Sequence, residues 1–321
     1  MLLATLAGLA AAIWAFGSIG FGSVVAVAGR IGAGGFSLYC LWSIGVFGVL
    51  GAAWLAVAIG EPIRLLGRFS WARAVREAVA DLLPFSQIGG IVVGVRTLLS
   101  RGIPTSRIYA SFVVDMTTEM AAQLVFTLFG LAMMITMLAA GGHAASLRPL
   151  ILGGTAVMIA VMILFFAGQR PALGLAGRIA HHFLPGSGAA MTGIADELRY
   201  IYARRWRVTF GFLLNLAGWV GTAIGSWVVL RMMGADISIW SALSLESLIF
   251  TLRSVAFAIP GAIGVQEAAY ALVGPLFGVA PETALALSLA KRARDLAVGL
   301  PTIIIWQLGE ARALVFAARK A

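Results

Sequence analysis

Long apolar runs separated by short polar stretches dominate the pattern of this chain. A helix needs about 20 apolar residues to cross the hydrocarbon core of a membrane. Runs of that kind predict membrane-spanning helices at 2–19, 34–59, 107–139, 150–168 and 207–230, and less regular ones at 239–258 and 281–308. We therefore predict an all-α, polytopic integral membrane protein with about seven to eight membrane-embedded helices.

Two segments, 61–82 and 170–206, show a different pattern. Their apolar residues recur every three or four positions with cations opposite, which is typical of an amphipathic helix lying in the membrane interface. Because arginine-rich segments tend to stay on the cytoplasmic side, we expect both segments and both termini to be cytoplasmic, with 140–149 and 231–237 outside. The cations of the first segment include Arg64, Arg68, Arg73 and Arg76.

Two further segments, 82–90 and 258–267, are apolar but too short and too broken for ordinary spans. Each is followed by a short predicted helix, the first ending at Leu99 and the second at about Leu276. Proline removes a backbone donor and glycine loosens a helix, so such backbone at membrane depth needs cover from protein or a wet cavity. We predict two re-entrant-type segments. Their broken-helix motifs are Pro84, Gln87, Gly89 and Gly90 in the first, and Pro260, Gly261 and Gly264 in the second.

The surroundings of the two breaks also match. Pro84 precedes Pro104 by 20 residues, and Pro260 precedes Pro281 by 21. In each case the short helix ends in a glycine-containing turn, and a long apolar helix with charges follows. Paired breaks at corresponding places in two halves point to a transporter binding site, although proline and glycine are also common in membrane helices generally.

The domain organisation that follows is a single transmembrane domain over 1–321. Within it we predict an internal structural repeat, with halves at about 34–140 and 238–310. The sequence leaves open whether the repeat is parallel or inverted.

Acidic residues stand inside the predicted span 107–139. Asp115, Glu119 and Gln123 follow one another at intervals of four, which places them on one helical face. A charged side chain at the bilayer centre costs roughly 2.5–3.5 kcal/mol even on the lenient insertion scale. That face therefore points away from lipid.

The last predicted span carries Arg292, Arg294 and Asp295 between two apolar stretches. Arg292 follows Pro281 by eleven residues, the offset at which Asp115 follows Pro104. Under the repeat hypothesis the two charges occupy equivalent positions and are able to pair. The alternative is a hydrated hinge between two short interfacial helices.

The helix before the second break offers another charged pair. Glu246 and Arg253 are seven residues apart, so they share one helical face, and Glu267 lies just past the break.

Composition supports the membrane assignment and narrows the chemistry. Hydrophobic residues make up 61% of the chain and charged residues 11%, against about 45–50% and about 25% in soluble domains. The net charge of +10 comes from clusters between apolar runs, as expected of cytoplasmic loops rather than of a nucleic-acid-binding groove. A lone Cys40 excludes a disulfide framework and a cysteine-based metal site. We expect no catalytic residues, no metal and no cofactor.

A family resemblance rests on the second break. The run Ile259-Pro260-Gly261-Ala262-Ile263-Gly264-Val265-Gln266-Glu267-Ala268 resembles the Pro-Gly-x-x-Gly-Val-x-Glu-Ala signature in the transmembrane region of lysylphosphatidylglycerol synthases. The stretch 276–279, Pro281 and Arg292 fit the pattern downstream of that signature. The upstream segments 71–78, 83–90 and 110–115 are similar to the smaller branch associated with hopanoid biosynthesis. The likeness covers roughly 70–310.

The resemblance implies a polytopic protein of the bacterial inner membrane that handles lipids. In full-length synthases this region is thought to move aminoacylated phospholipid between leaflets, while a separate soluble domain makes that lipid. We expect no soluble aminoacyl-transferase domain within 1–321. The expected partners are membrane lipids (anionic or aminoacylated phospholipids, or hopanoids) and lipid-biosynthesis enzymes.

Our leading hypothesis is a lipid translocator, or a translocation subunit, without enzymatic activity. Arginines would hold a headgroup phosphate, and carboxylates would balance them or engage a cationic headgroup. Two alternatives stay open: a non-catalytic scaffold for lipid-synthesis enzymes, and a membrane enzyme with Asp115 or Glu119 as general acid/base. The candidate site residues are Arg96, Asp115, Glu119, Glu246, Arg253, Glu267, Arg292, Arg294 and Asp295.

Overall fold

The computed structural model describes residues 13–83, 86–99, 102–140, 188–255 and 262–318, with the single residues 160 and 163. All regular structure in these ranges is helical, which confirms the predicted fold class. The first helices are α2 (Phe21–Gly29), α3 (Gly32–Val57), the short 3-10 helix η1 (Ile63–Leu65), α4 (Leu66–Leu82), α5 (Ser86–Leu99) and α6 (Thr105–Ala140). The later ones are α8 (Gly188–Ala203), α9 (Arg205–Met232), α10 (Ile239–Val255), α11 (Val265–Val273), the 3-10 helix η3 (Gly274–Phe277) and α12 (Pro281–Ala318).

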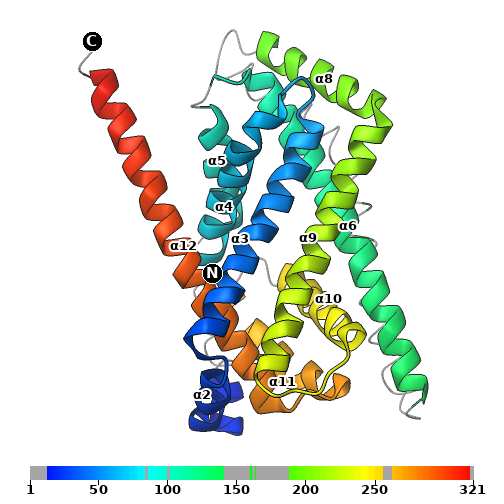
Figure 1. Cartoon of the computed structure of the whole chain (residues 1–321). Coiled ribbons are helices and arrows are strands. Elements are labelled where there is room, and N and C mark those ends of the chain that lie inside the picture. The colour runs from blue at the N-terminus through cyan, green and yellow to red at the C-terminus, as the bar shows by residue number, and fades with distance from the viewer. Residues whose placement is uncertain are drawn as a thin grey trace.

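Helices α3, α6 and α9 form the long walls of the bundle (Figure 1). Among the described residues, these three are long and apolar enough to cross a membrane. They confirm the spans predicted at 34–59, 107–139 and 207–230. Helix α10 has 17 residues, fewer than a full span needs, and the predicted span 150–168 lies outside the described residues except for positions 160 and 163.

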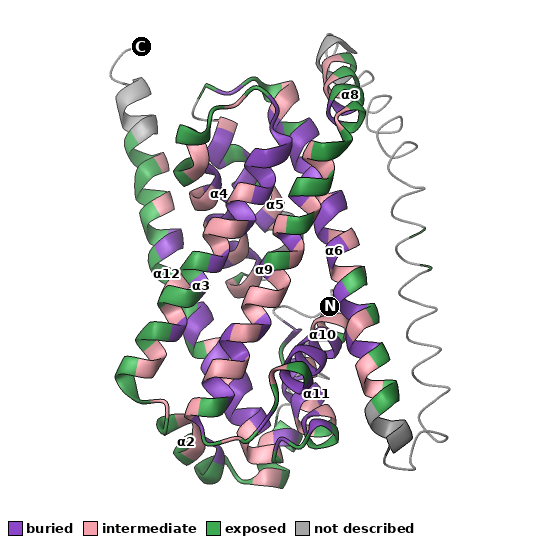
Figure 2. Ribbon diagram, turned by 45° about the vertical axis from the view of Figure 1, so that its right-hand side comes forward, coloured by how far each residue is buried: buried purple, intermediate pink, exposed green. Residues whose placement is uncertain are grey.

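The long helices are exposed on their outer faces, whereas buried residues line their inner faces (Figure 2). Large exposed apolar side chains include Leu41 on α3, Leu213 on α9, and Ile304 and Leu308 on α12. Exposed apolar surface on this scale is costly in water but suits contact with lipid. The arrangement is that of a polytopic membrane protein.

Helices α3 and α9 pack closely and run in opposite directions. Gly218 of α9 faces Leu50 of α3, where an added Cβ atom would lie 2.4 Å from a leucine methyl carbon. About two turns away along each helix, Gly225 approaches Trp42 in the same way. The absence of side chains at these positions lets the two backbones approach each other, as in other membrane helix pairs.

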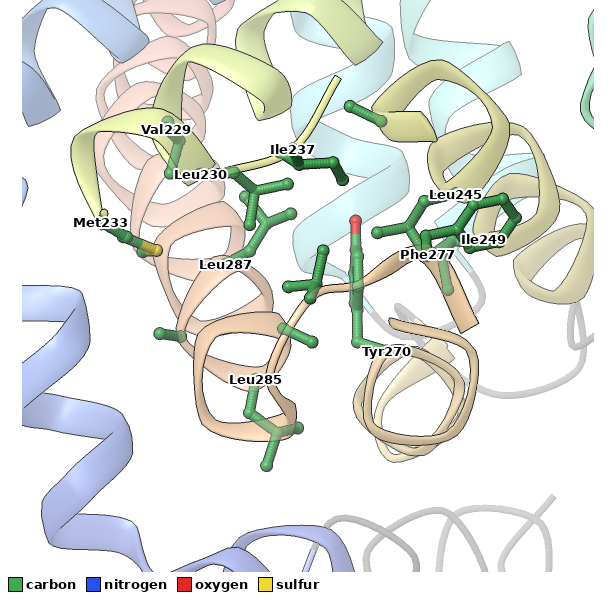
Figure 3. Close-up of a cluster of buried hydrophobic side chains, with 14 of the residues drawn as sticks. Val229, Leu230, Met233, Ile237, Leu245, Ile249, Tyr270, Phe277, Leu285 and Leu287 are labelled. Carbon is green, nitrogen blue, oxygen red and sulfur yellow. The ribbon is translucent and has the colours of Figure 1, made fainter. Parts of the chain in front are cut away.

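Two helical hairpins enter the bundle from opposite ends. The α4–α5 hairpin lies in the half that contains α8, and the α10–α11 hairpin lies in the opposite half (Figure 1). We call these ends the α8 end and the α11 end. A separate hydrophobic cluster holds each hairpin: Phe69 and Leu98 belong to the cluster at the α8 end, and Ile249 and Tyr270 to the cluster at the α11 end (Figure 3).

Each hairpin is followed by a long helix that crosses to the other half. Helix α6 starts at the α8 end and packs against α10, whereas α12 starts at the α11 end and packs against α4 (Figure 1). The sequence α3-α4-α5-α6 therefore corresponds to α9-α10-α11-α12 in the opposite orientation. This geometry favours an inverted repeat over a parallel one, with α9 as part of the second unit.

The first broken segment is shorter than the sequence indicates. Helix α4 ends at Leu82 and α5 begins at Ser86, so Gly89 and Gly90 lie within a helix rather than in a break. A Cβ atom on Gly90 would lie 2.6 Å from the Arg76 carbonyl oxygen, so this glycine allows the two arms of the hairpin to touch. The side chain of Gln87 and the residues Pro84, Pro260 and Gly261 lie outside the described part of the structure.

The predicted interfacial position of 61–82 is wrong. Helix α4 packs against α3, α5 and α12, and Arg73 is only 1% exposed. Arg73 and Arg76 of α4 pair with a carboxylate on α6. These ion pairs hold the polar face of α4 inside the bundle. Arg64 and Arg68, near the start of this segment, are exposed. The described part of the second amphipathic segment, α8, lies across the end of the bundle (Figure 1).

Candidate functional site

A cavity of about 260 Å³ lies in the middle of the bundle, between the two hairpins. Side chains from α3, α4, α6, α9, α10 and α12 line it. Its charged lining residues are Arg73, Arg76, Glu77, Asp81, Glu119, Arg253 and Arg294. Its aromatic lining residues are Tyr39, Trp42, Phe47, Trp219 and Phe250. The cavity thus offers charge and apolar surface side by side.

An ion-pair cluster between α4 and α6 forms one wall. The Arg73 guanidinium makes two contacts with the Glu119 carboxylate, one of them at 2.9 Å, and its Nε lies 2.9 Å from Glu77. The Arg76 guanidinium donates a hydrogen bond of 3.0 Å to Glu119. Arg73 and Arg76 are one turn apart on α4, so both can reach the same carboxylate. This cluster satisfies the charges that α6 carries inside the bundle.

Asp115 lies behind this wall and is fully buried. It accepts hydrogen bonds from the Asn215 amide at 3.2 Å and from Arg73 at 3.5 Å. Asn215 also bonds the Thr118 hydroxyl at 3.1 Å. Asp115 does not line the cavity. Its contact with Arg73 helps to hold that arginine in position.

The expected pairing of Asp115 with Arg292 is wrong. Arg292 bonds Glu267 through its Nε at 3.2 Å, on the α11 side of α12. Helix α6 packs mainly against α9 and α10, whereas α12 packs mainly against α4 and α2, so the two charges meet different neighbours.

The ends of α4 and α10 meet at the cavity. The Arg253 guanidinium donates a hydrogen bond of 3.1 Å to Asp81, and the two side chains are 18% and 23% exposed. Ala262, the first described residue after the second break, also lines the cavity and has a positive φ of 50°. The structure thus brings the end of α4, just before the first break, and Ala262 of the second break to one site. The predicted pairing of Glu246 with Arg253 is wrong, because Arg253 turns to α4 instead.

Arg294 reaches the cavity from α12. Its guanidinium bonds the adjacent Asp295 at 2.5 Å and the Ser43 hydroxyl at 3.3 Å, and it lies 5.6 Å from the centre of the Tyr39 ring. Its Nε is buried with no hydrogen-bond partner among the described residues. Arg294 therefore retains donor capacity beside the cavity.

The signature motif of the second break forms a local structural unit. Gly264 has a φ of 82° and its N–H donates to Glu267 Oε2 at 2.7 Å, which caps the start of α11. The other Glu267 oxygen accepts hydrogen bonds from Ser288 at 3.1 Å and from Arg292. Glu267 and Arg292 therefore hold α11 against α12 and lie outside the cavity lining.

Three other predicted residues are also absent from the cavity lining, among them Asp295, which pairs with Arg294. Arg96 is on the outer face of α5, where its 56% exposed side chain pairs with Glu310 of α12 at 2.9 Å. Glu246 is buried near the α11 end and pairs with Lys291 at 2.5 Å. Of the candidate residues, the cavity brings together Glu119, Arg253 and Arg294.

The sequence interpretation missed the α4 contribution to the cavity. The spacing of its polar residues is that of any amphipathic helix, so it predicts an interfacial position. The residues concerned are Arg73, Arg76, Glu77 and Asp81. The sequence does contain one signal for this contact. The two buried carboxylates on α6 need cations to neutralise them, and α4 has two arginines one turn apart.

The comparisons with known proteins agree with this picture. A family model described as the lysylphosphatidylglycerol synthase TM region matches residues 1–302. Neither the curated proteins nor the solved structures gave a match. Assignment to the hopanoid-associated branch stays a prediction.

The first prediction concerns the Arg73–Glu119 pair. Replacing one member of a buried pair leaves the other charge uncompensated, which typically costs about 3–5 kcal/mol. We expect Arg73→Gln and Glu119→Gln each to lower the free energy of unfolding by about that amount. The double variant should lose less than the sum of the two single losses, because the residues interact directly. Unfolding in detergent, followed by circular dichroism, measures these differences.

The matched control is Arg96→Gln, which removes an arginine from an exposed pair. Its effect should stay within about 1 kcal/mol. Strictly additive losses in the Arg73–Glu119 cycle would contradict the cluster as described.

Proposed function

Because the chain belongs to the lysylphosphatidylglycerol synthase TM-region family, we propose that it binds lipid headgroups in the central cavity and moves them between membrane leaflets. The observation that carries this proposal is the cavity itself, in which seven charged side chains lie inside a bundle with an apolar exterior. Intramembrane charges of this kind usually mark a substrate path. The protein performs no chemical conversion in this proposal.

The two kinds of cavity wall suit the two parts of a lipid. Arg253 and Arg294 offer guanidinium groups to a phosphate, for which arginine has a favourable bidentate geometry. Trp42 lines the cavity and is 44% exposed, so it links the cavity to the outer surface. A headgroup among the charges would thus leave its acyl chains beside apolar and aromatic surface. This lining favours a charged phospholipid over an uncharged hopanoid.

In this proposal the two helical hairpins move during transport. We infer that α4–α5 and α10–α11 are re-entrant, each dipping into the bilayer from its own side. Their ends meet through Asp81 and Arg253. A headgroup phosphate competes with Asp81 for Arg253, so binding would loosen the contact between the hairpins. Opposed broken segments around one site are also the arrangement used by many secondary transporters.

The distribution of arginines indicates which end of the bundle faces the cytoplasm. The starts of α4, α6 and α9, helix α8 and the end of α12 lie at the α8 end (Figure 1). Arginines in or directly next to these segments are Arg64, Arg68, Arg107, Arg199, Arg204, Arg205, Arg207 and Arg312. At the α11 end, the described arginines are Arg30, in the turn between α2 and α3, and Arg231, in the last turn of α9. We infer from the positive-inside rule that the α8 end faces the cytoplasm of a bacterial inner membrane.

Cysteine labelling tests this orientation. In a Cys40→Ser background, Arg68→Cys and Arg199→Cys should react with a membrane-impermeant maleimide only after the cells are opened. Asp236→Cys, at the α11 end, should react from outside in intact cells. Labelling of position 68 or 199 in intact cells would overturn the orientation.

A leaflet-resolved lipid assay in proteoliposomes tests the proposed activity. Purified protein should move a headgroup-labelled phospholipid between leaflets. The neutral double variant Asp81→Asn/Arg253→Gln should reduce the rate at least tenfold, because it removes the ion pair between the hairpins, including one phosphate-binding arginine, without leaving either partner unpaired. The matched control Arg96→Gln/Glu310→Gln removes a similar ion pair outside the cavity and should keep the wild-type rate.

The other outcomes separate the rival functions. Equal rates in the two double variants would contradict the role of the cavity. Chemical conversion of the lipid would show a membrane enzyme, and absence of both movement and conversion would favour a scaffold.

A further inference from the structure

Almost all side-chain carboxylates of this chain are already engaged in ion pairs. The chain has 23 basic and 13 acidic side chains, and every Asp and Glu lies among the described residues. Twelve of these carboxylates pair with an arginine or lysine side chain. The remaining one, Glu282, is in the first turn of α12, at the α11 end. Unpaired arginines at the α8 end therefore need counter-anions from outside the chain.

Three such arginines lie together where α8 passes into α9 (Figure 1). Arg204 stands between the two helices, and Arg205 and Arg207 are in the first turn of α9. Arg205 is exposed, and the other two are half-buried. Positive charges this close repel one another, and an anion that binds among them removes that repulsion.

The nearest acidic residues are those of α8, and both have other partners. Asp196 pairs with Arg199 at 2.8 Å, and Glu197 lies 3.6 Å from Arg107. The chain itself thus supplies no carboxylate to the three arginines.

Aromatic rings hold two of the three guanidinium groups. The guanidinium carbon of Arg204 lies 3.6 Å from the centre of the Tyr200 ring, and that of Arg207 lies 4.4 Å from the Trp206 ring. A guanidinium stacked on a ring keeps N–H groups at its edge for bidentate contact with a phosphate. We call this group of residues the α8–α9 corner: Tyr200, Arg204, Arg205, Trp206 and Arg207.

An apolar stripe on α9 begins at the same point. Trp206, Phe210 and Leu213 are spaced by four and three residues, so they share one helical face, and they are 63%, 49% and 51% exposed. Helix α9 is long and apolar enough to cross a membrane, so this stripe suits contact with acyl chains. The arginines at its end therefore lie at the level of the lipid headgroups, where exposed tryptophan is also common.

We propose that the α8–α9 corner is a binding site for an anionic phospholipid of the leaflet at the α8 end. The three guanidinium groups bind the headgroup phosphate, and an acyl chain lies along the apolar stripe of α9. The phosphate supplies the missing counter-charge, and the stripe supplies an apolar contact that a free phosphate ion or a soluble acidic protein does not need. This lipid stays in its leaflet, so the site is separate from the central cavity and does not rest on the proposed lipid movement.

Native mass spectrometry of the purified full chain in detergent tests this site. The protein is mixed with phosphatidylglycerol and phosphatidylcholine that carry the same acyl chains. The wild type should retain phosphatidylglycerol at least about tenfold better, because arginines near a membrane surface favour anionic headgroups. Arg204→Gln/Arg205→Gln/Arg207→Gln should lower this retention at least about tenfold. The cavity variant Asp81→Asn/Arg253→Gln should keep it.

A matched control separates a defined site from the general positive charge of this end. Arg64→Gln/Arg68→Gln/Arg312→Gln removes three exposed arginines of the α8 end that have no ion pair among the described residues. Its retention of phosphatidylglycerol should stay within about threefold of the wild type. Arg204→Lys/Arg207→Lys is a second variant that keeps the charges and loses the planar forks. It should lower retention at least about threefold, and it tests the site even if the triple corner variant fails to fold.

Four results would overturn the proposal. The first is equal retention of the two lipids by the wild type, and the second is an equal loss in the two triple variants. The third is full displacement of phosphatidylglycerol by an equal concentration of inorganic phosphate, which would show a site for free anions. The last is a bound lipid that the cavity variant loses and the corner variants keep. That lipid would lie in the cavity and would support the proposed function instead.

Discussion

The interaction between Arg73 and Glu119 determines how the centre of this protein is built. A carboxylate on α6 cannot face lipid, and the cation that neutralises it stands on α4. The pair therefore requires α4 to enter the bundle rather than lie on the membrane surface. Once α4 is inside, it must turn back, and the α4–α5 hairpin together with its opposed counterpart encloses the cavity. The fold and the candidate site thus follow from one electrostatic requirement.

The sequence predicted the features that depend on local pattern. Apolar run length located α3, α6 and α9, and the spacing of Asp115 and Glu119 identified an inward face. The breaks next to Pro84 and Pro260 were also visible. Each of these depends on neighbours within a few turns of one helix, which is the range over which periodicity carries information.

The partners of the charges could not be obtained in this way. Arg73 and Glu119 are 46 residues apart in the chain, and their contact depends on how α4 crosses α6. An amphipathic pattern is the same whether its cations face water or buried carboxylates. The supposed match of Asp115 with Arg292 failed for a related reason: an equal offset from a proline says nothing about which helices α6 and α12 pack against, and these differ.

The signature at the second break illustrates the difference between recognition and function. Its Glu267 caps α11 and holds Arg292, so the motif fixes local geometry. The residues that face the cavity from the same half, Arg253 and Arg294, are held by Asp81 and Asp295. In this account the motif keeps a broken helix in place, and the charges around it provide the binding surface.

Photo-cross-linking with a phospholipid that carries a diazirine in its headgroup tests the central claim most directly. After illumination of the protein in nanodiscs, mass spectrometry locates the modified residues. The account predicts cross-links on the cavity sides of α4 and α10, around Asp81 and Arg253, which an excess of unlabelled phospholipid suppresses. Cross-links confined to the outer apolar faces, such as Ile304 and Leu308 of α12, would contradict a headgroup site inside the bundle.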